Sequence, residues 1–203
     1  MASRLMSMHD EHVASKPPVK PRALIVIADG SDELETLVLS DILTRGDLHV
    51  STASVGRKKD NLVGGSFGMK IKAEHAFEDC SYRSYELIVL PGGLGTTRLR
   101  NCDLLAKMLR KQRDTGKWYA AISSAPAVVL KELGLLPARA TCDMAHERLM
   151  LNQFEDEAVV VEGNCVTSQG PGTAIQFALK LVELLCGREE AVRVAKEVRS
   201  PMP

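Results

Sequence analysis

Short, continuous apolar runs alternate with longer amphipathic stretches along this chain, and the alternation constrains the fold more than any other feature. Residues 23–28 (ALIVIA) and 87–90 (LIVL) are apolar and partly β-branched, without polar residues in between. Such runs are typical of strands buried on both faces of a parallel sheet. Because helical spacing follows the strands, the pattern predicts an α/β fold with a doubly wound, mainly parallel sheet between layers of helices.

The remaining segments extend this alternation. A helix is predicted after residue 31, with Ser31 or Asp32 as its N-cap. Its amphipathic pattern rests on Leu34, Leu37, Val38, Ile42 and Leu43. A hairpin turn is predicted at Gly163 and Asn164. The other predicted strands are segments 48–55, 118–123 and 138–142, and the other predicted helices are segments 102–116, 126–134, 172–187 and 188–198.

The pattern predicts a single domain over residues 22–197. Residues 1–21 are polar, close in a proline-rich stretch and lack the apolar core of a signal peptide, so a flexible N-terminal extension is predicted there. Asp10 and Glu11 disfavour a mitochondrial presequence. Residues 198–203 are predicted to be a C-terminal tail.

Charge and cysteine content narrow the function classes. The 26 basic and 26 acidic residues leave a formal net charge of zero, so nothing favours nucleic acid or an anionic membrane as a partner. The five cysteines are odd in number and lack C-x-x-C spacing, which argues against disulfides and a metal site. With no apolar run of about twenty residues, a soluble, cytoplasmic protein is expected.

Ligands of such sheets bind outside the carboxyl ends of the strands, so the segments after each strand are the candidates for chemistry. They are residues 28–35 (ADGSDELE), 91–95 (PGGLG), 123–126 (SSAP), 141–146 (TCDMAH) and 167–173 (TSQGPGT). None of them carries a G-K-[ST] or a G-x-G-x-x-G pattern. No nucleotide or other cofactor is therefore expected.

Ser123 stands where a predicted strand turns directly into a helix, a position that holds the nucleophile in many α/β enzymes. A serine nucleophile also needs a base within hydrogen-bond reach and donors for an oxyanion. G-x-S-x-G is absent, and only His75 and His146 are placed to approach the elbow. Both histidines are expected at the surface.

Three other strand ends carry candidate groups with simpler structural explanations. Glu35 either complements the helix dipole and faces water, which spacing alone favours, or shares a proton with a nucleophile. Gly92 and Gly93 either form a tight turn or offer backbone N–H groups to an oxyanion. Pro171 is predicted to begin a helix, beside a shallow pocket.

Taken together, these segments resemble the ThiJ/PfpI superfamily, and specifically its DJ-one-like branch. The resemblance runs from about residue 22 to about residue 196. Five motifs carry it in the family's order: ALIVIADGSDELET, SFGMKIKAE, ELIVLPGG, AAISSAPAVVL and TSQGPGTAIQFALKLVE. It implies a flavodoxin-like sandwich that forms a homodimer.

The resemblance also implies roles for particular residues. The family's elbow reads A-I-C-A-G-P, so Ser123 occupies the position of a low-pKa cysteine. Glu35 matches the protonated glutamate that partners this cysteine, and the backbone of Gly93 and Ser124 matches the oxyanion donors. Asp143 stands where several members have a histidine. Two positions of the chemistry therefore depart from the family pattern.

The family activities implied are glyoxalase-type conversion of methylglyoxal to lactate, repair of glycated substrates and oxidative-stress sensing, all of which rely on the thiol. We therefore expect a retained pocket for a small carbonyl or glycated compound, with thiol chemistry lost or much reduced. One alternative is a serine-dependent hydrolase or deglycase using Ser123 with Glu35 or His146. Another is a thiol enzyme carrying a Cys-to-Ser replacement. Cys142 is a weak candidate for a substitute thiol, because adjacent strand residues face opposite ways.

Overall fold

The computed structural model describes residues 19–56 and 60–202, so residues 1–18 of the predicted N-terminal extension lie outside it. A seven-stranded sheet forms the centre of the fold, in the order β5-β2-β1-β6-β7-β9-β8. All its neighbouring strands pair in parallel except β8 and β9. The strands are β1 (Arg22–Ile27), β2 (His49–Ser54), β5 (His75–Ala76), β6 (Leu87–Leu90), β7 (Trp118–Ile122), β8 (Val159–Glu162) and β9 (Cys165–Ser168).

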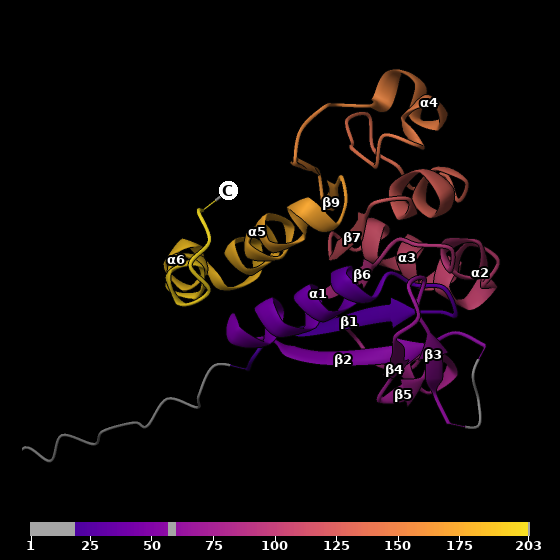
Figure 1. Cartoon of the computed structure of the whole chain (residues 1–203), viewed down its shortest axis with the longest axis horizontal. Helices are drawn as coiled ribbons and strands as arrows, with labels where there is room; N and C mark the ends of the chain where they lie inside the picture. Colours follow the sequence, from indigo (N-terminus) through magenta and orange to yellow (C-terminus); the bar gives the residue numbers. More distant parts are fainter. Residues whose placement is uncertain (1–18, 57–59, 203) are drawn as a thin grey trace, which may run out of the picture.

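Helices cover both faces of this sheet (Figure 1). On one side, α1 (Glu33–Arg45), α5 (Ala174–Cys186) and α6 (Arg188–Glu197) pack against Ile25 and Ile27 of β1. On the other, α2 (Thr96–Arg100) and α3 (Asp103–Asp114) pack against Leu24 and Val26 of the same strand. Because successive strand residues point to opposite faces, a wholly apolar β1 serves both cores. This three-layered, flavodoxin-like arrangement confirms the predicted fold class.

Several local predictions are confirmed or corrected. β8 and β9 form the predicted antiparallel hairpin, and Gly163 in its turn has a φ of 59°. Segment 138–142 is not a strand, because it makes only an isolated bridge between Ala140 and Phe154. The predicted apolar side of α1 is partly wrong: Ile42 and Leu43 are buried, whereas Leu34 and Leu37 are exposed.

Three smaller elements complete the structure around the strand ends. A second sheet of two antiparallel strands, β3 (Leu62–Gly64) and β4 (Lys70–Lys72), presents the loop between them near the end of β1. A π-helical turn, Pro126–Lys131, follows β7, and the short helix α4 (Glu147–Met150) comes later. Within the part of the chain that the structure describes, no helix is long and apolar enough to cross a membrane.

Candidate functional site

The chain turns sharply at Ser123, directly after β7. Ser123 has a φ of 63°, a left-handed conformation that costs a non-glycine residue on the order of 1 kcal/mol. Its N–H donates to the Ser168 carbonyl at 2.9 Å, which ties the elbow to the end of β9. The strained turn lifts the Ser123 side chain out of the strand and into a cavity.

Glycine is required on the segment facing this elbow. A Cβ on Gly92 would lie 2.6 Å from the Ser123 Cβ, and a Cβ on Gly93 would lie 2.5 Å from the Gly30 carbonyl oxygen. Gly93 also has a φ of 88°, which favours glycine. Among the described residues, no hydrogen bond uses the N–H of Gly93 or of Ser124. The Gly92 N–H, in contrast, is already bound by Glu35.

Glu35 is fully buried beneath the elbow rather than facing water. Its Oε2 accepts the Gly92 N–H at 2.7 Å, and its Oε1 has no hydrogen-bond partner in the described chain. Burial raises the pKa of Glu35 to about 7, and the nearby charges of Asp32 and Asp143 also raise it. The Gly92 N–H lowers this pKa but does not outweigh burial. The side chain is therefore partly protonated near neutral pH.

A carboxylate lies between the elbow serine and a histidine. The Ser123 hydroxyl donates to Asp143 Oδ2 at 3.3 Å, while Asp143 Oδ1 accepts the His146 N–H at 2.9 Å. The imidazole Nδ1 of His146 lies 2.7 Å from the same Oδ1. His146 thus lines the cavity while its side chain stays 33% exposed, and it is one of the two histidines that the sequence placed near the elbow. His75 does not, because it pairs in edge strand β5.

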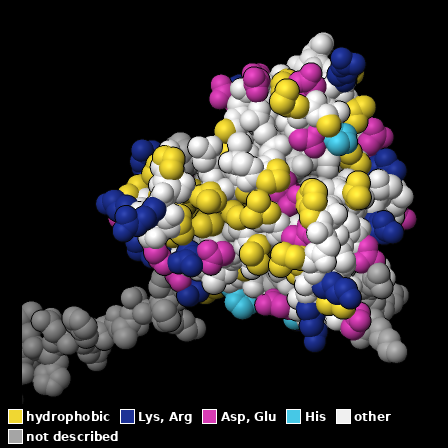
Figure 2. All heavy atoms as spheres, in the orientation of Figure 1, with side chains coloured by type: hydrophobic (Ala, Val, Ile, Leu, Met, Phe, Trp, Pro, Cys, Tyr) yellow, Lys and Arg dark blue, Asp and Glu magenta, His cyan; other side chains and the backbone are white. Residues whose placement is uncertain are grey.

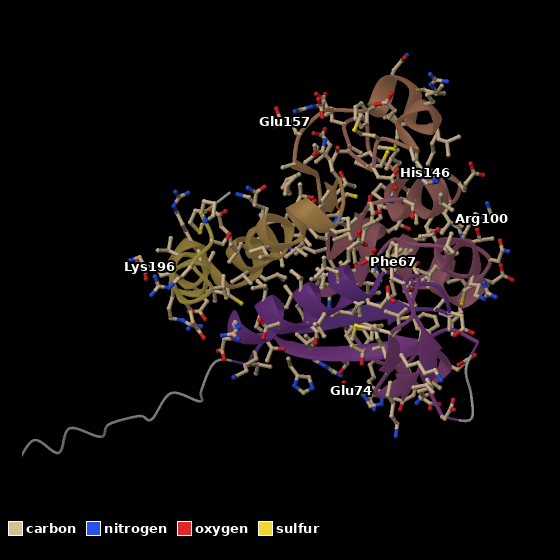
Figure 3. All side chains as sticks on the ribbon, viewed as in Figure 1. Phe67, Glu74, Arg100, His146, Glu157 and Lys196 are labelled. Carbon is tan, nitrogen blue, oxygen red and sulfur yellow. The ribbon has the colours of Figure 1, made fainter. Side chains whose placement is uncertain are left out.

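These groups meet around a cavity of about 530 Å³ at the carboxyl ends of the parallel strands. Figure 3 shows Phe67 and His146 reaching this region from different elements, Phe67 from the β3–β4 loop and His146 from the start of α4. Of the lining residues, the sequence singled out Gly93, Ser123, Ser124, Asp143, His146 and Pro171. It missed Asp32, Ser66, Phe67, Leu94, Thr96, Thr97 and Val128.

The loop that carries Phe67 is fixed by polar contacts. The buried Glu33 carboxylate accepts the N–H groups of Phe67 and Met69 at 2.7 and 3.1 Å. Ser66 Oγ donates to the Gly30 carbonyl at 2.6 Å and accepts the Leu94 N–H at 3.2 Å. The signal in the sequence for this wall was the motif SFGMKIKAE, one of the five that carry the family resemblance.

Cys142 does not offer a thiol to the cavity. Its side chain is buried in a small cluster with Ala127, Ala140 and Met150, and its Sγ contacts the Asp143 carbonyl at 3.2 Å. Burial raises the pKa of Cys142 to about 12. No cysteine lines the cavity, and no group of three or more potential metal ligands occurs in the described ranges.

Comparison with known proteins supports the family resemblance that the sequence motifs indicate. The DJ-1/PfpI family model matches residues 21–184. Protein DJ-1 homolog A of Arabidopsis thaliana is 40% identical over 179 residues, which are 87% of this chain and 45% of that protein. The chain also spans 40% of Arabidopsis DJ-1 homolog B, so it covers less than half the length of either plant relative. The glutathione-independent glyoxalase DJR-1.2 of Caenorhabditis elegans is 31% identical over 180 residues, 87% of this chain and 95% of that protein.

Solved structures agree with this assignment. Oxidized Toxoplasma gondii DJ-1 superposes with a TM-score of 0.85 at 33% identity, covering 89% of this chain and 98% of that one. Drosophila melanogaster DJ-1beta gives a TM-score of 0.85 at 31% identity, covering 90% of this chain and all of that one. The family model matches most of the chain, and the sheet, the elbow at Ser123 and the buried Glu35 all lie within the matched residues. The chain therefore belongs to the DJ-1/PfpI family.

Proposed function

We propose that this protein keeps the small-molecule pocket of its family but has lost, or much reduced, thiol-dependent glyoxalase and deglycase activity. The observation that carries the proposal is Ser123 itself, a hydroxyl at the strained elbow of a cavity that no cysteine lines. Cys142, one residue before Asp143, is buried and directed into a separate cluster. A stress-response role based on cysteine oxidation would likewise have no sulfur at this position.

The difference between hydroxyl and thiol is large. A cysteine has an ordinary pKa of about 8.5, and its site can lower that value until the thiolate predominates at neutral pH. A serine hydroxyl is a far weaker acid and needs a positioned base. Asp143 is in contact at 3.3 Å, but a carboxylate is a weak base and a poor proton acceptor for a hydroxyl. Glu35 is partly protonated and suits a hydrogen-bond donor better than a base.

A serine-dependent hydrolase or deglycase is the second candidate. The contacts that favour it are the Ser123 to Asp143 hydrogen bond, the Asp143 to His146 contact and the free N–H groups of Gly93 and Ser124. In a catalytic triad, however, the imidazole contacts the serine and the carboxylate orients the imidazole. Here the order is reversed, because the carboxylate lies in the middle. This candidate therefore ranks below the first, and a Cys-to-Ser replacement in a thiol enzyme ranks third.

A small carbonyl compound or a glycated substrate is the proposed ligand. Similarity to a glutathione-independent glyoxalase supports this class. The free N–H groups of Gly93 and Ser124 beside Ser123 are suited to a carbonyl oxygen, and a cavity of about 530 Å³ accommodates a small molecule. No cofactor is needed for such binding.

We infer that the protein forms a homodimer through the outer side of α1. Figure 2 shows apolar side chains gathered over α1 and its surroundings. Leu34 and Leu37 are 54 and 58% exposed, and Ile175 at the start of α5 is 38% exposed. Exposed apolar side chains this close together mark interaction surfaces. Sedimentation of the full chain should give twice the monomer mass, and a monomer at micromolar concentration would contradict this inference.

A reducing compartment such as the cytoplasm is the proposed location. All five cysteines are free. Free thiols persist where glutathione and thioredoxin keep them reduced. Fractionation of cells that express the full chain would test this proposal, and recovery in an oxidising compartment would contradict it.

Lactate production from methylglyoxal tests the main proposal. The wild type and Ser123→Ala should be equally inactive, while Ser123→Cys should gain at least about a hundredfold in rate. Ser84→Cys, which places a thiol at an exposed position outside the cavity, should gain nothing. Wild-type turnover that Ser123→Ala abolishes would reject the proposal. Labelling of Ser123 by a fluorophosphonate would then identify the serine-dependent enzyme.

A further inference from the structure

The cavity at the strand ends carries a negative charge. Asp32 and Asp143 line it, and neither lysine nor arginine occurs among the described residues of its lining. Glu33 lies buried just behind the wall, where its carboxylate binds the β3–β4 loop. A carboxylate or phosphate ligand would therefore meet like charges at close range. Cationic and neutral ligands are compatible with the negative electrostatic potential of these carboxylates.

Three hydroxyl groups of the cavity wall donate their hydrogen to backbone carbonyls and cannot donate it to a ligand. Ser66 Oγ donates to the Gly30 carbonyl at 2.6 Å, and Thr96 Oγ1 donates to the Gly93 carbonyl at 2.9 Å. Ser124 Oγ also donates to Gly93, at 3.4 Å. A hydroxyl has one hydrogen, so a group that spends it internally offers only lone pairs to the cavity. These three hydroxyls therefore present acceptors to the cavity, which suits a ligand with several donors.

Two carboxylate oxygens are available to such a ligand. Asp32 is only 6% exposed, and its Oδ1 accepts the Glu35 N–H at 3.0 Å. Its Oδ2 has no hydrogen-bond partner among the described residues, and the side chain lines the cavity. Asp143 Oδ2 receives one bond, from Ser123 at 3.3 Å. An ammonium group has three hydrogen-bond donors and a positive charge, so it can bind both carboxylate oxygens and complement their negative charge.

An aromatic side chain stands at the rim of the same cavity. Phe67 is 83% exposed, yet its backbone is fixed through the Glu33 carboxylate. Leu94, which is 77% exposed, and Val128 add apolar surface to the lining. An exposed phenyl ring on a backbone held by hydrogen bonds is suited to contact with an apolar substituent or with a cation over its face.

We propose that the cavity binds a small primary amine that carries an apolar group, with its ammonium at Asp143 and Asp32 and its apolar group against Phe67. This inference rests on the proposed function, because it specifies the ligand class of the same pocket. The free N–H groups of Gly93 and Ser124 leave room for a carbonyl oxygen in the same molecule. Amino-carbonyl compounds and amine adducts of carbonyls thus fall within the proposed class.

Benzylamine, benzyl alcohol and benzoate provide a matched set of probes, since they share a ring and differ in the charge of the head group. Their dissociation constants are measured by NMR titration of the full chain at about pH 8, where alkyl ammonium and carboxylate groups are charged. Benzylamine should bind at least about tenfold more tightly than benzyl alcohol, and benzoate should bind more weakly than either.

Variants assign the effect to the proposed residues. Asp143→Asn and Asp32→Asn keep the side-chain shape, and each should remove most of the preference for the amine. Phe67→Ala should weaken benzylamine and benzyl alcohol by similar factors. Asp114→Asn, at an exposed position on α3 outside the cavity, should change nothing.

The outcomes separate this inference from the proposed function. Equal or tighter binding of benzyl alcohol or benzoate overturns the amine preference and leaves a ligand pocket in place. A preference for benzylamine that persists in both asparagine variants overturns the assignment to Asp143 and Asp32. Absence of binding by all three probes overturns this inference, whereas the proposed loss of thiol chemistry still stands or falls with the methylglyoxal assay.

Discussion

Two cavities on this molecule differ in size and in what lines them. The cavity at the strand ends measures about 530 Å³, and a groove along α1 measures about 610 Å³. The groove is lined by Leu37, Val38, Ser40, Asp41, Ile42, Thr44, Ile175 and Val198. Its acid, Asp41, is paired with Arg45 at 2.8 Å. The strand-end cavity instead gathers carboxylates, an imidazole and free N–H groups.

The comparison shows that the placement of polar groups identifies a chemical site better than volume does. Parallel strands bring their carboxyl ends to one edge of the sheet, so loops distant in sequence converge there. The groove belongs to one helix face and its neighbours, and exposed apolar side chains of this kind are typical of an interaction surface. The following changes test whether the two cavities differ in this way.

The pH dependence of stability should separate the cavities most strongly. Glu35 has its pKa raised from 4.5 to about 7, so between these values the native state holds a proton that the unfolded chain has released. The free energy of unfolding should therefore fall by up to about 3 kcal/mol as pH rises through this window, and level off above it. Urea denaturation at a fixed protein concentration measures the change.

Glu35→Gln should flatten that profile, because the amide does not titrate and still accepts the Gly92 N–H. Asp41→Asn, in the α1 groove, serves as the matched control and should keep the wild-type slope. A wild-type profile that rises between about pH 4.5 and 7 would show that Glu35 is ionised throughout and would contradict the raised pKa.

Gly92→Ala should destabilise the protein by about 2 kcal/mol. The new methyl group would lie 2.6 Å from the Ser123 Cβ and 3.1 Å from the Ile122 carbonyl oxygen, so the elbow must shift. Gly172→Ala is the control, because a Cβ there meets no atom within 4 Å. Its stability should change by less than about 0.5 kcal/mol in chemical denaturation. Equal effects of the two variants would mean that the elbow is not tightly packed.

Leu37→Glu should raise the dissociation constant of the proposed dimer at least about tenfold, since a charge would be buried at the interface. Leu94→Glu places the same charge at the rim of the strand-end cavity and should leave the dimer intact. Analytical ultracentrifugation measures both variants. Dissociation by Leu94→Glu alone would move the interface to the other cavity and reverse the comparison.

Phe67→Ala should change the free energy of unfolding by less than about 0.5 kcal/mol, because the ring is 83% exposed. Leu39→Ala, on the buried side of α1, should cost about 3 kcal/mol and provides the contrast. Thermal and urea unfolding check both values. A large loss on removing the Phe67 ring would mean that it stabilises the fold rather than serving a ligand.

The sequence predicted the sheet and the elbow because their signals are local. Continuous apolar runs mark strands buried on both faces, and Ser123 follows such a run at the point where helical spacing begins. The burial of Glu35 was not predicted from spacing, since an acid in the first turn of a helix ordinarily faces water. The resemblance to a family suggested its position beneath the elbow.

Leu34 and Leu37 show the limit of periodicity. They fit the apolar pattern of α1 but point away from the core, because the helix carries apolar residues on more than one side. Periodicity reports amphipathic character without saying which side meets the sheet. His146 shows the same limit for polar residues, since only the turn after Asp143 brings its ring to that carboxylate.

By itself, the sequence determined the main alternation of strands and helices and the presence of a hydroxyl at the elbow after β7. Only the tertiary structure decided which groups meet at the strand ends: Asp143 between Ser123 and His146, Glu35 beneath them, and Phe67 on a loop held by Glu33. The physical reason is that secondary structure follows from residues close in the chain. The cavity, in contrast, is built by segments more than a hundred residues apart that the parallel sheet brings to one edge.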